Sequence, residues 1–300
     1  MRGALAQPDP VRRVVVGFPA GGLADRLARI VAEALGQAAS SGFIVENRPG
    51  AGGMIATEQV ARAEGDGRVL LLHNVDALGS ERALKADPGF DPLRSLTIVA
   101  PVARFEYVVV ANAGLGLRNL QDLVSQGRAP ATTLFYVDAG PGVRMVFESL
   151  KRKYRLDLVG VPYSGLAPAM NDLLAGRVAL AMLDGATAAA HVAAGKVTII
   201  GRADLIASGH ASKIPTLVEQ GAEGIWLDTR FALMVPVSTP AATIEQLRLL
   251  VARTLKKSAV RAQLLEAAYH PIDDAPEQFA RAAAESVEHY RRLAQQAGML

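Results

Sequence analysis

The stretch VVVGFPAGGLAD, residues 14–25, sets how the chain begins to fold. Three β-branched valines predict a strand, the paired glycines predict a turn, and the apolar spacing of residues 27–35 predicts a helix. Because the first turn of a helix has backbone N–H groups without partners, an anion can bind at such a turn. The alternative is a plain tight turn between a core strand and a packing helix. The stretch has neither the G-x-G-x-x-G spacing of dinucleotide-binding folds nor the Lys-Ser/Thr pair of a P-loop, so it leaves both interpretations open.

The composition predicts a large core and excludes several kinds of site. The chain has 300 residues, of which 50% are hydrophobic, and this length favours two domains. It has no cysteine, which excludes disulfides, thiolate zinc sites and cysteine catalysis. The net charge is only +3 and aromatic residues make up 5%, so we expect no nucleic-acid partner.

Strands and helices alternate along the chain, which predicts an α/β fold with parallel strands. The order of strand, glycine turn and helix returns at residues 132–154, with its turn at residues 138–142. In open α/β sheets, ligands bind beyond the carboxyl ends of the strands. The two glycine turns are therefore candidate ligand sites, as are the residues that follow the buried strands at 69–72 and 178–183.

Two polar residues at these strand ends each have two interpretations. His73 is a lone histidine that either makes a structural hydrogen bond or contacts the ligand. Asp184 ends a buried strand and precedes Gly185, so it either contacts the ligand or caps the alanine-rich helix that follows. The sequence leaves both choices open.

The chain is expected to cross between domains twice. The first crossing is placed between two apolar stretches, at residues 104–106, and the second in a long predicted strand at residues 226–235. Two crossings make the first domain discontinuous. We predict domain 1 at residues 1–103 plus 228–300 and domain 2 at residues 104–227, with a short helix starting at residues 214–217.

A reactive group is not evident in the sequence. The five histidines show no metal-binding spacing, no serine has the G-x-S-x-G context of a hydrolase, and no carboxylate pair stands out. Glycine turns without a nucleophile favour binding over catalysis. We therefore expect no enzyme activity, no metal and no cofactor.

Several motifs together resemble one family over almost the whole chain. They are found at residues 16–25, at VENRPGAGG (45–53), at VPYSG (161–165), at DLLAG (172–176) and at IPTL (214–217). These motifs resemble the Bug family, the extracytoplasmic substrate-binding proteins of tripartite tricarboxylate transporters. The VENRPGAGG run is the most specific of them.

The resemblance implies a two-domain α/β fold of the periplasmic-binding-protein type II, with the ligand cleft at the hinge. It implies capture of a small organic acid for a tripartite tricarboxylate-type transporter, membrane transporter subunits or a sensor as partners, and a monomer. A periplasmic location is expected from the resemblance alone, because residues 1–10 are too short for a signal peptide, although residues 4–6 have the form of a cleavage site. The alternatives are an enzyme or a regulatory or sensor domain on the same fold, or a drifted paralogue with a non-carboxylate ligand.

The resemblance also implies which residues hold the ligand. In the family, the loops that match residues 18–22 and 139–142 bind the carboxylate, and the position of Asp184 lies in the same pocket. With neighbouring residues of the strand ends, the predicted ligand-binding set is Phe18, Ala20, Gly21, Gly22, His73, Asn74, Asp138, Ala139, Gly140, Gly142, Arg144, Tyr163, Asp184 and Arg230.

This sequence departs from the family in the second loop, which is usually rich in serine and small polar residues. Here Asp138, Pro141 and Arg144 are part of it, and Pro141 removes a backbone donor. Arg230 also stands where an aromatic residue is usual. One hypothesis is that Arg144 or Arg230 compensates by binding a ligand with more than one acidic group. The rival hypothesis is that each arginine pairs with Asp138, Asp184 or Asp228, since an unpaired buried charge is costly.

Overall fold

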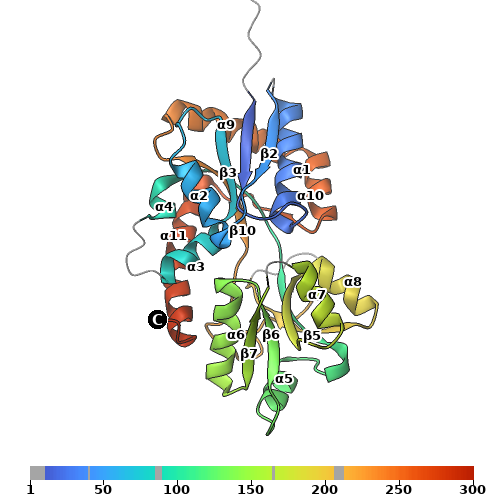
Figure 1. Ribbon diagram of the computed structural model, residues 1–300. Coiled ribbons are helices and arrows are strands. Elements are labelled where there is room, and N and C mark those ends of the chain that lie inside the picture. The colour runs from blue at the N-terminus through green and yellow to red at the C-terminus, as the bar shows by residue number, and fades with distance from the viewer. Residues whose placement is uncertain (1–10, 40, 85–89, 164–165, 206–212) are drawn as a thin grey trace, which may run out of the picture. The chain divides into compact units, whose positions relative to one another are not determined.

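The computed structural model describes residues 11–39, 41–84, 90–163, 166–205 and 213–300 (Figure 1). Their contacts divide the chain into two compact units, each with its own sheet. Unit 1 comprises Met1–Asn74, Gly89–Ala103 and Phe231–Arg281, and unit 2 comprises Val75–Pro88, Arg104–Arg230 and Ala282–Leu300. The predicted cleavage-site residues 4–6 lie outside the described residues.

The sheet of unit 1 has six strands in the order β11-β4-β10-β3-β1-β2. β1 is parallel to β2 and β3, as predicted, whereas β10 is antiparallel to β3. The central strands are buried because their valines and leucines are covered by helices. The strand bounds are β1 (Arg12–Val16), β2 (Phe43–Asn47), β3 (Val69–Asn74), β4 (Leu96–Arg104), β10 (Arg230–Pro236) and β11 (His270–Pro271).

The first helix of unit 1 follows directly from the opening stretch. In α1 (Leu23–Ala38), residues Leu27, Val31 and Leu35 are fully buried, and this four-residue spacing puts them on one face of the helix. α1 packs against α9 and α10 as well as β1, β2 and β3 (Figure 1). The other helical elements are η1 (Ala51–Gly53), α2 (Met54–Ala61), α4 (Pro92–Ser95), α9 (Ala241–Leu255), α10 (Ser258–Glu266) and α11 (Pro276–Gln296), whose later part belongs to unit 2.

The sheet of unit 2 has five strands in the order β7-β6-β8-β5-β9. β6 is parallel to β7 and β8, while β5 is antiparallel to β8 and β9. The strand bounds are β5 (Tyr107–Asn112), β6 (Leu134–Asp138), β7 (Leu158–Pro162), β8 (Leu180–Asp184) and β9 (Val197–Arg202). The helical elements are α3 (Val75–Leu84), η2 (Ala113–Leu115), α5 (Leu120–Gly127), α6 (Pro141–Tyr154), α7 (Leu166–Leu174) and α8 (Gly185–Ala193).

Two local predictions are wrong. The strand predicted at residues 226–235 begins only at Arg230, because Trp226 stacks on the His289 ring and the Thr229 hydroxyl donates to the Phe105 carbonyl. These contacts hold residues 226–229 outside the sheet. The helix predicted at residues 214–217 is a turn, in which the backbone of Thr216 forms a bridge with Arg202.

The two units divide the chain differently from the predicted domain ranges at three segments. Val75–Pro88, residues 228–230 and Ala282–Leu300 belong to unit 2 by their contacts, although all three are predicted in domain 1. The ranges 1–103 plus 228–300 and 104–227 stay a prediction for the domains. Among the described residues, we find no helix with the length and apolar character needed to cross a membrane.

Candidate functional site

The glycine loop of unit 1, residues 18–22, is held in place by a buried carboxylate at the start of α1. Asp25 is 3% exposed and accepts hydrogen bonds from the Gly21 backbone N–H (2.8 Å) and from Arg29 Nε (2.9 Å). Asn47 Nδ2 donates both to Asp25 Oδ1 (2.9 Å) and to the Phe18 carbonyl (3.1 Å). Asn47 belongs to the VENRPGAGG run, so this motif fixes the shape of the first loop.

Asp25 is ionised in this environment. Burial alone would raise its pKa, but the hydrogen bonds from Arg29, Gly21 and Asn47 outweigh burial and hold the pKa below the ordinary value. The fixed loop leads into α1, whose N-cap residue Gly22 provides no side-chain cap. The backbone N–H groups in the first turn of α1 are therefore suited to an anion. Of the predicted residues here, Ala20, Gly21 and Gly22 are exposed.

His73 supports this loop from the end of β3. Its side chain is fully buried, its ring centroid lies 5.1 Å from that of Phe18, and its Nδ1 lies 2.9 Å from the Asn74 carbonyl oxygen. Burial lowers the pKa of His73 to about 4, and backbone hydrogen bonds with Asn74 and Gly52 offset this only in part. A neutral, buried imidazole that packs against Phe18 fits the structural interpretation of His73. The ligand contacts of His73 and Asn74 stay predictions.

The protonation of His73 makes the stability of the protein depend on pH. The unfolded chain takes up this proton below pH 6.5, whereas the folded protein does so only near pH 4, so stability falls as the pH drops between these values. From pH 7.5 to pH 5, we expect wild type to lose about 2 kcal/mol more than His73→Gln. Urea unfolding at both pH values measures this difference. Parallel pH profiles for the two proteins would show that His73 is not buried in its neutral form.

The second glycine loop, in unit 2, begins at the end of β6 with a buried carboxylate of its own. Asp138 Oδ1 accepts the Gly140 N–H (3.2 Å), and Asp138 Oδ2 accepts Arg144 Nε (2.7 Å) and lies 2.6 Å from Arg144 Nη2. The Asp138 side chain is 8% exposed and that of Arg144 is 45% exposed. Gly140, with φ at 130°, is the N-cap residue of α6 and provides no side-chain cap. Ala139 is exposed beside it.

Tyr163 and Asp184 lie at neighbouring strand ends of the same sheet. β7 pairs with β6 so that Pro162 is opposite Asp138, and the Tyr163 N–H donates to the Asp138 carbonyl (3.3 Å). The Tyr163 hydroxyl donates to Asp172 Oδ2 (2.7 Å). Asp184 Oδ1 accepts the Thr187 N–H (2.9 Å), so Asp184 caps α8. Asp184 Oδ2 is buried and has no hydrogen-bond partner among the described residues, so a ligand contact there stays a prediction.

Arg230 forms a buried ion pair with Asp76. The Asp76 carboxylate is fully buried and accepts Arg230 Nε (3.0 Å), Arg230 Nη2 (2.5 Å) and the Arg230 N–H (2.8 Å). The Tyr290 hydroxyl donates to the same carboxylate (3.1 Å). Asp228 Oδ2 lies 3.7 Å from Arg230 Nε, and burial together with the charge of Asp76 raises the pKa of Asp228 to about 6.

Both arginines thus form the intramolecular pairs of the rival hypothesis. Arg144 pairs with Asp138, and Arg230 pairs with Asp228 and, more closely, with Asp76. Sequence reasoning did not name Asp76 as a partner. The only feature that points to Asp76 as the partner of Arg230 is the register of β10 against β3. This register puts Phe231 opposite Asn74, and it therefore puts Arg230 beside the start of α3. This register does not follow from the local pattern of either strand.

The predicted ligand residues therefore form separate groups within the two units. In unit 1, Phe18, Ala20, Gly21 and Gly22 form the first loop, and His73 packs on Phe18. In unit 2, Asp138, Gly140 and Arg144 contact one another, and Tyr163 joins them through its backbone, whereas Arg230 belongs to the Asp76 pair. Gly142 follows Pro141 in the first turn of α6.

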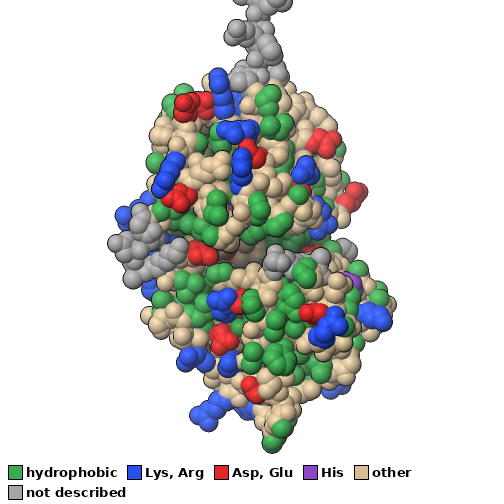
Figure 2. All heavy atoms as spheres, in the orientation of Figure 1, with side chains coloured by type: hydrophobic (Ala, Val, Ile, Leu, Met, Phe, Trp, Pro, Cys, Tyr) green, Lys and Arg blue, Asp and Glu red, His purple; other side chains and the backbone are tan. Residues whose placement is uncertain are grey.

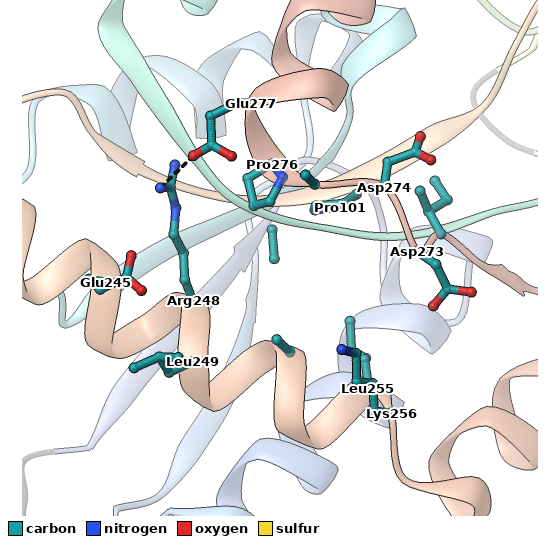
Figure 3. Close-up of a pocket in the computed structure, with 14 residues that line it drawn as sticks. Pro101, Glu245, Arg248, Leu249, Leu255, Lys256, Asp273, Asp274, Pro276 and Glu277 are labelled. Atoms are coloured by element: carbon teal, nitrogen blue, oxygen red, sulfur yellow. Dashed lines mark ion pairs between the residues drawn. The ribbon is translucent and has the colours of Figure 1, made fainter.

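Unit 1 also has a cavity that none of these residues lines. It measures about 380 Å³ and lies between α9, residues 272–277 and the strand residues Ala100 and Pro101 (Figure 3). Arg248 points toward Glu277 at one side, and their atoms Nη1 and Oε1 are 2.7 Å apart (Figure 3). The lining is mixed in charge, with Lys256 and Asp274 at the other side.

The surface and the polar clusters provide few other candidate sites. On the face shown in Figure 2, lysine and arginine side chains are interspersed with aspartate and glutamate in both units. Within the described part of the chain, no group of three or more histidine, aspartate or glutamate side chains is arranged to hold a metal ion.

Three solved structures resemble this chain over nearly its whole length. An R. palustris protein with adipate is 27% identical with a TM-score of 0.86, covering 97% of this chain and 98% of that one. The periplasmic binding protein BugD is 26% identical with a TM-score of 0.84, covering 98% and 99%. MatC from Rhodopseudomonas palustris with bound malate is 26% identical with a TM-score of 0.83, covering 96% and 99%.

These likenesses confirm the predicted two-domain α/β fold of periplasmic binding proteins. The family described as tripartite tricarboxylate transporter family receptor matches residues 27–299. The family and the similar structures are solute-binding proteins and not enzymes. By sequence and by fold, the chain belongs to the tripartite tricarboxylate transporter receptor family, as a Bug-type solute-binding protein.

Proposed function

We propose that this protein captures a small organic acid in the periplasm for the membrane subunits of a tripartite tricarboxylate-type transporter. The observation that carries the proposal is the first loop, which Asp25 and Asn47 hold rigid in front of the uncapped first turn of α1. Rigid backbone donors at the positive end of a helix dipole bind a carboxylate without a further ordering cost. The adipate and malate bound by the similar proteins are ligands of this class.

In this proposal, residues 18–22 bind the ligand carboxylate. Phe18, supported by His73, provides an apolar surface, and Asp184 Oδ2 accepts a hydrogen bond from a ligand hydroxyl or ammonium group. Arg230 acts as a structural residue through Asp76. Binding needs no bond to form or break, so the protein works through affinity alone.

The periplasmic location, the transporter partner and the monomeric state are parts of the same proposal. The family description names a transporter receptor, and BugD is a periplasmic binding protein. A solute-binding protein of this kind must release its ligand to a membrane partner, which requires reversible binding.

The proposal predicts that carboxylates stabilise the protein and that their neutral analogues do not. The measurement is thermal unfolding of ligand-free protein with paired probes, such as adipate against adipamide, benzoate against benzamide, and amino acids. A ligand at a hundred times its dissociation constant adds about 2.7 kcal/mol of stability.

The matched variant for this test is Asn47→Ala, which removes the hydrogen bonds to the Phe18 carbonyl and to Asp25. We expect its carboxylate affinity to fall about tenfold, because a looser loop must be ordered on binding. Equal stabilisation by acids and amides, or no stabilisation by any acid, would contradict the proposed ligand class. Unchanged affinity of Asn47→Ala would remove the first loop from the site.

A further inference from the structure

The second glycine loop already holds a carboxylate, and that carboxylate comes from the chain itself. Asp138 Oδ1 accepts the N–H of Gly140, the residue in front of α6, while Asp138 Oδ2 accepts Arg144 Nε. A backbone N–H and a guanidinium at the start of a helix are the donors that a ligand carboxylate would use. In this loop they are engaged before any ligand arrives, as the Gly21 N–H and Arg29 are by Asp25 in the first loop, and the second loop differs in the proline at the start of its helix.

Little binding capacity for another anion is left at the start of α6. Pro141 has no N–H at the first helical position. The charge of Arg144 is balanced by Asp138 at 2.6 Å. An incoming carboxylate would have to displace the Asp138 side chain or lie beside it.

The charges at the neighbouring strand end also oppose a second anion. Asp184, at the end of the adjacent parallel strand β8, uses one carboxylate oxygen to cap α8 and keeps the other buried without a partner among the described residues. The ends of β6 and β8 therefore have two carboxylates, of which Arg144 pairs with Asp138. Like charges in a partly buried site repel more strongly than in water.

We propose that Asp138 determines specificity: its carboxylate occupies the second loop in place of a ligand carboxylate, so the protein selects acids with a single carboxylate. This inference rests on the proposed function and narrows its ligand class. The end of the ligand opposite its carboxylate is neutral or donates hydrogen bonds. Arg144 is a positioning residue that holds Asp138 against Gly140.

The test compares acids that differ only in the second carboxylate. Calorimetric titration of wild type uses the pairs butyrate and succinate, hexanoate and adipate, and benzoate and terephthalate. We expect the monoacid of the pair that fits to bind at least about tenfold more tightly than its diacid. In Asp138→Asn, we expect this ratio to shift toward the diacid by about tenfold or more, because the negative charge of residue 138 is removed and Arg144 loses its anionic partner.

The matched control is Asp122→Asn in the same unit. Asp122 also accepts one backbone N–H and one arginine Nε, both from Arg118, and each at 3.0 Å, but it lies in α5 outside the loop. The control is expected to keep the wild-type ratio. Circular dichroism and the fluorescence of Trp226, the only tryptophan, check that each variant is folded.

The outcomes separate this inference from the proposed function. The role of Asp138 is overturned if wild type binds the diacid of a pair as tightly as the monoacid, or more tightly. It is also overturned if the affinity ratio is unchanged in Asp138→Asn. The wild-type ratio decides the matter even if Asp138→Asn does not fold. If neither member of any pair binds to wild type, the proposed function fails and this inference fails with it.

Discussion

Gly53→Ala is expected to destabilise unit 1 by about 3–5 kcal/mol, because the cost of a left-handed backbone at alanine adds to the cost of overpacking. Gly53 has a φ of 92°, a conformation that side chains disfavour. An added Cβ would also overlap Nε2 of the buried His73 ring. The ring cannot move aside without losing its contact with Phe18. Urea unfolding followed by circular dichroism measures the loss.

The control for this prediction is Gly116→Ala in unit 2. Gly116 has a φ of 68°, and nothing lies within 4 Å of an added Cβ, so this variant has the backbone strain without the collision. It is expected to lose about 1–2 kcal/mol. A loss in Gly53→Ala no greater than this would show that His73 does not pack against the loop. If the collision matters, His73→Ala should recover part of the stability of Gly53→Ala.

Arg230→Met is expected to destabilise unit 2 by about 3–5 kcal/mol, because it leaves a buried carboxylate without its cation. Asp76 is fully buried. Of the hydrogen bonds to Asp76 described above, the variant would keep those from the Tyr290 hydroxyl and from the backbone N–H of residue 230. The fluorescence of Trp226 reports on this unit during urea unfolding. The double variant Asp76→Asn/Arg230→Met is expected to lose less than the single variant, since the buried charge of Asp76 is removed together with its cation.

The matched control is Arg261→Met, which breaks an exposed pair. Arg261 binds Asp273 through two hydrogen bonds of 2.7 and 3.0 Å, but these side chains are 35% and 65% exposed. Exposed pairs contribute about 0–1 kcal/mol, so this variant should unfold almost like wild type. Additive losses in the double variant would refute the buried pair. Ligand affinity that falls at least about tenfold in folded Arg230→Met would instead return Arg230 to the ligand site.

The first loop illustrates how far sequence reasoning reaches into the candidate site. The strand, turn and helix of residues 14–35 follow from local patterns, and the structure has each of them. The second loop was also predicted, at the end of β6. Which groups satisfy the loop donors was not predictable, because Asn47 reaches Phe18 across 29 residues and the hydrogen bond depends on the packing of β2 beside β1.

The interpretation of charged residues depended still more on the tertiary structure. Sequence alone left Arg144 open between a ligand and a neighbouring acid, and the structure pairs it with Asp138. Asp184 was open between a ligand contact and a helix cap, and the structure shows the cap. A side chain's charge is visible in the sequence, but its partner is set by burial and distance.

The α/β class, the strand-turn-helix units and the family are visible in the sequence, because they depend on short-range periodicity and on contiguous motifs. The pairing of Arg230 with Asp76, 154 residues away, and the position of Gly53 against His73 are visible only in the folded protein. They depend on the register and packing of the strands. Antiparallel pairing of β10 with β3 and close packing of the loop against β3 bring these residues together, and neither leaves a periodic signal in the chain.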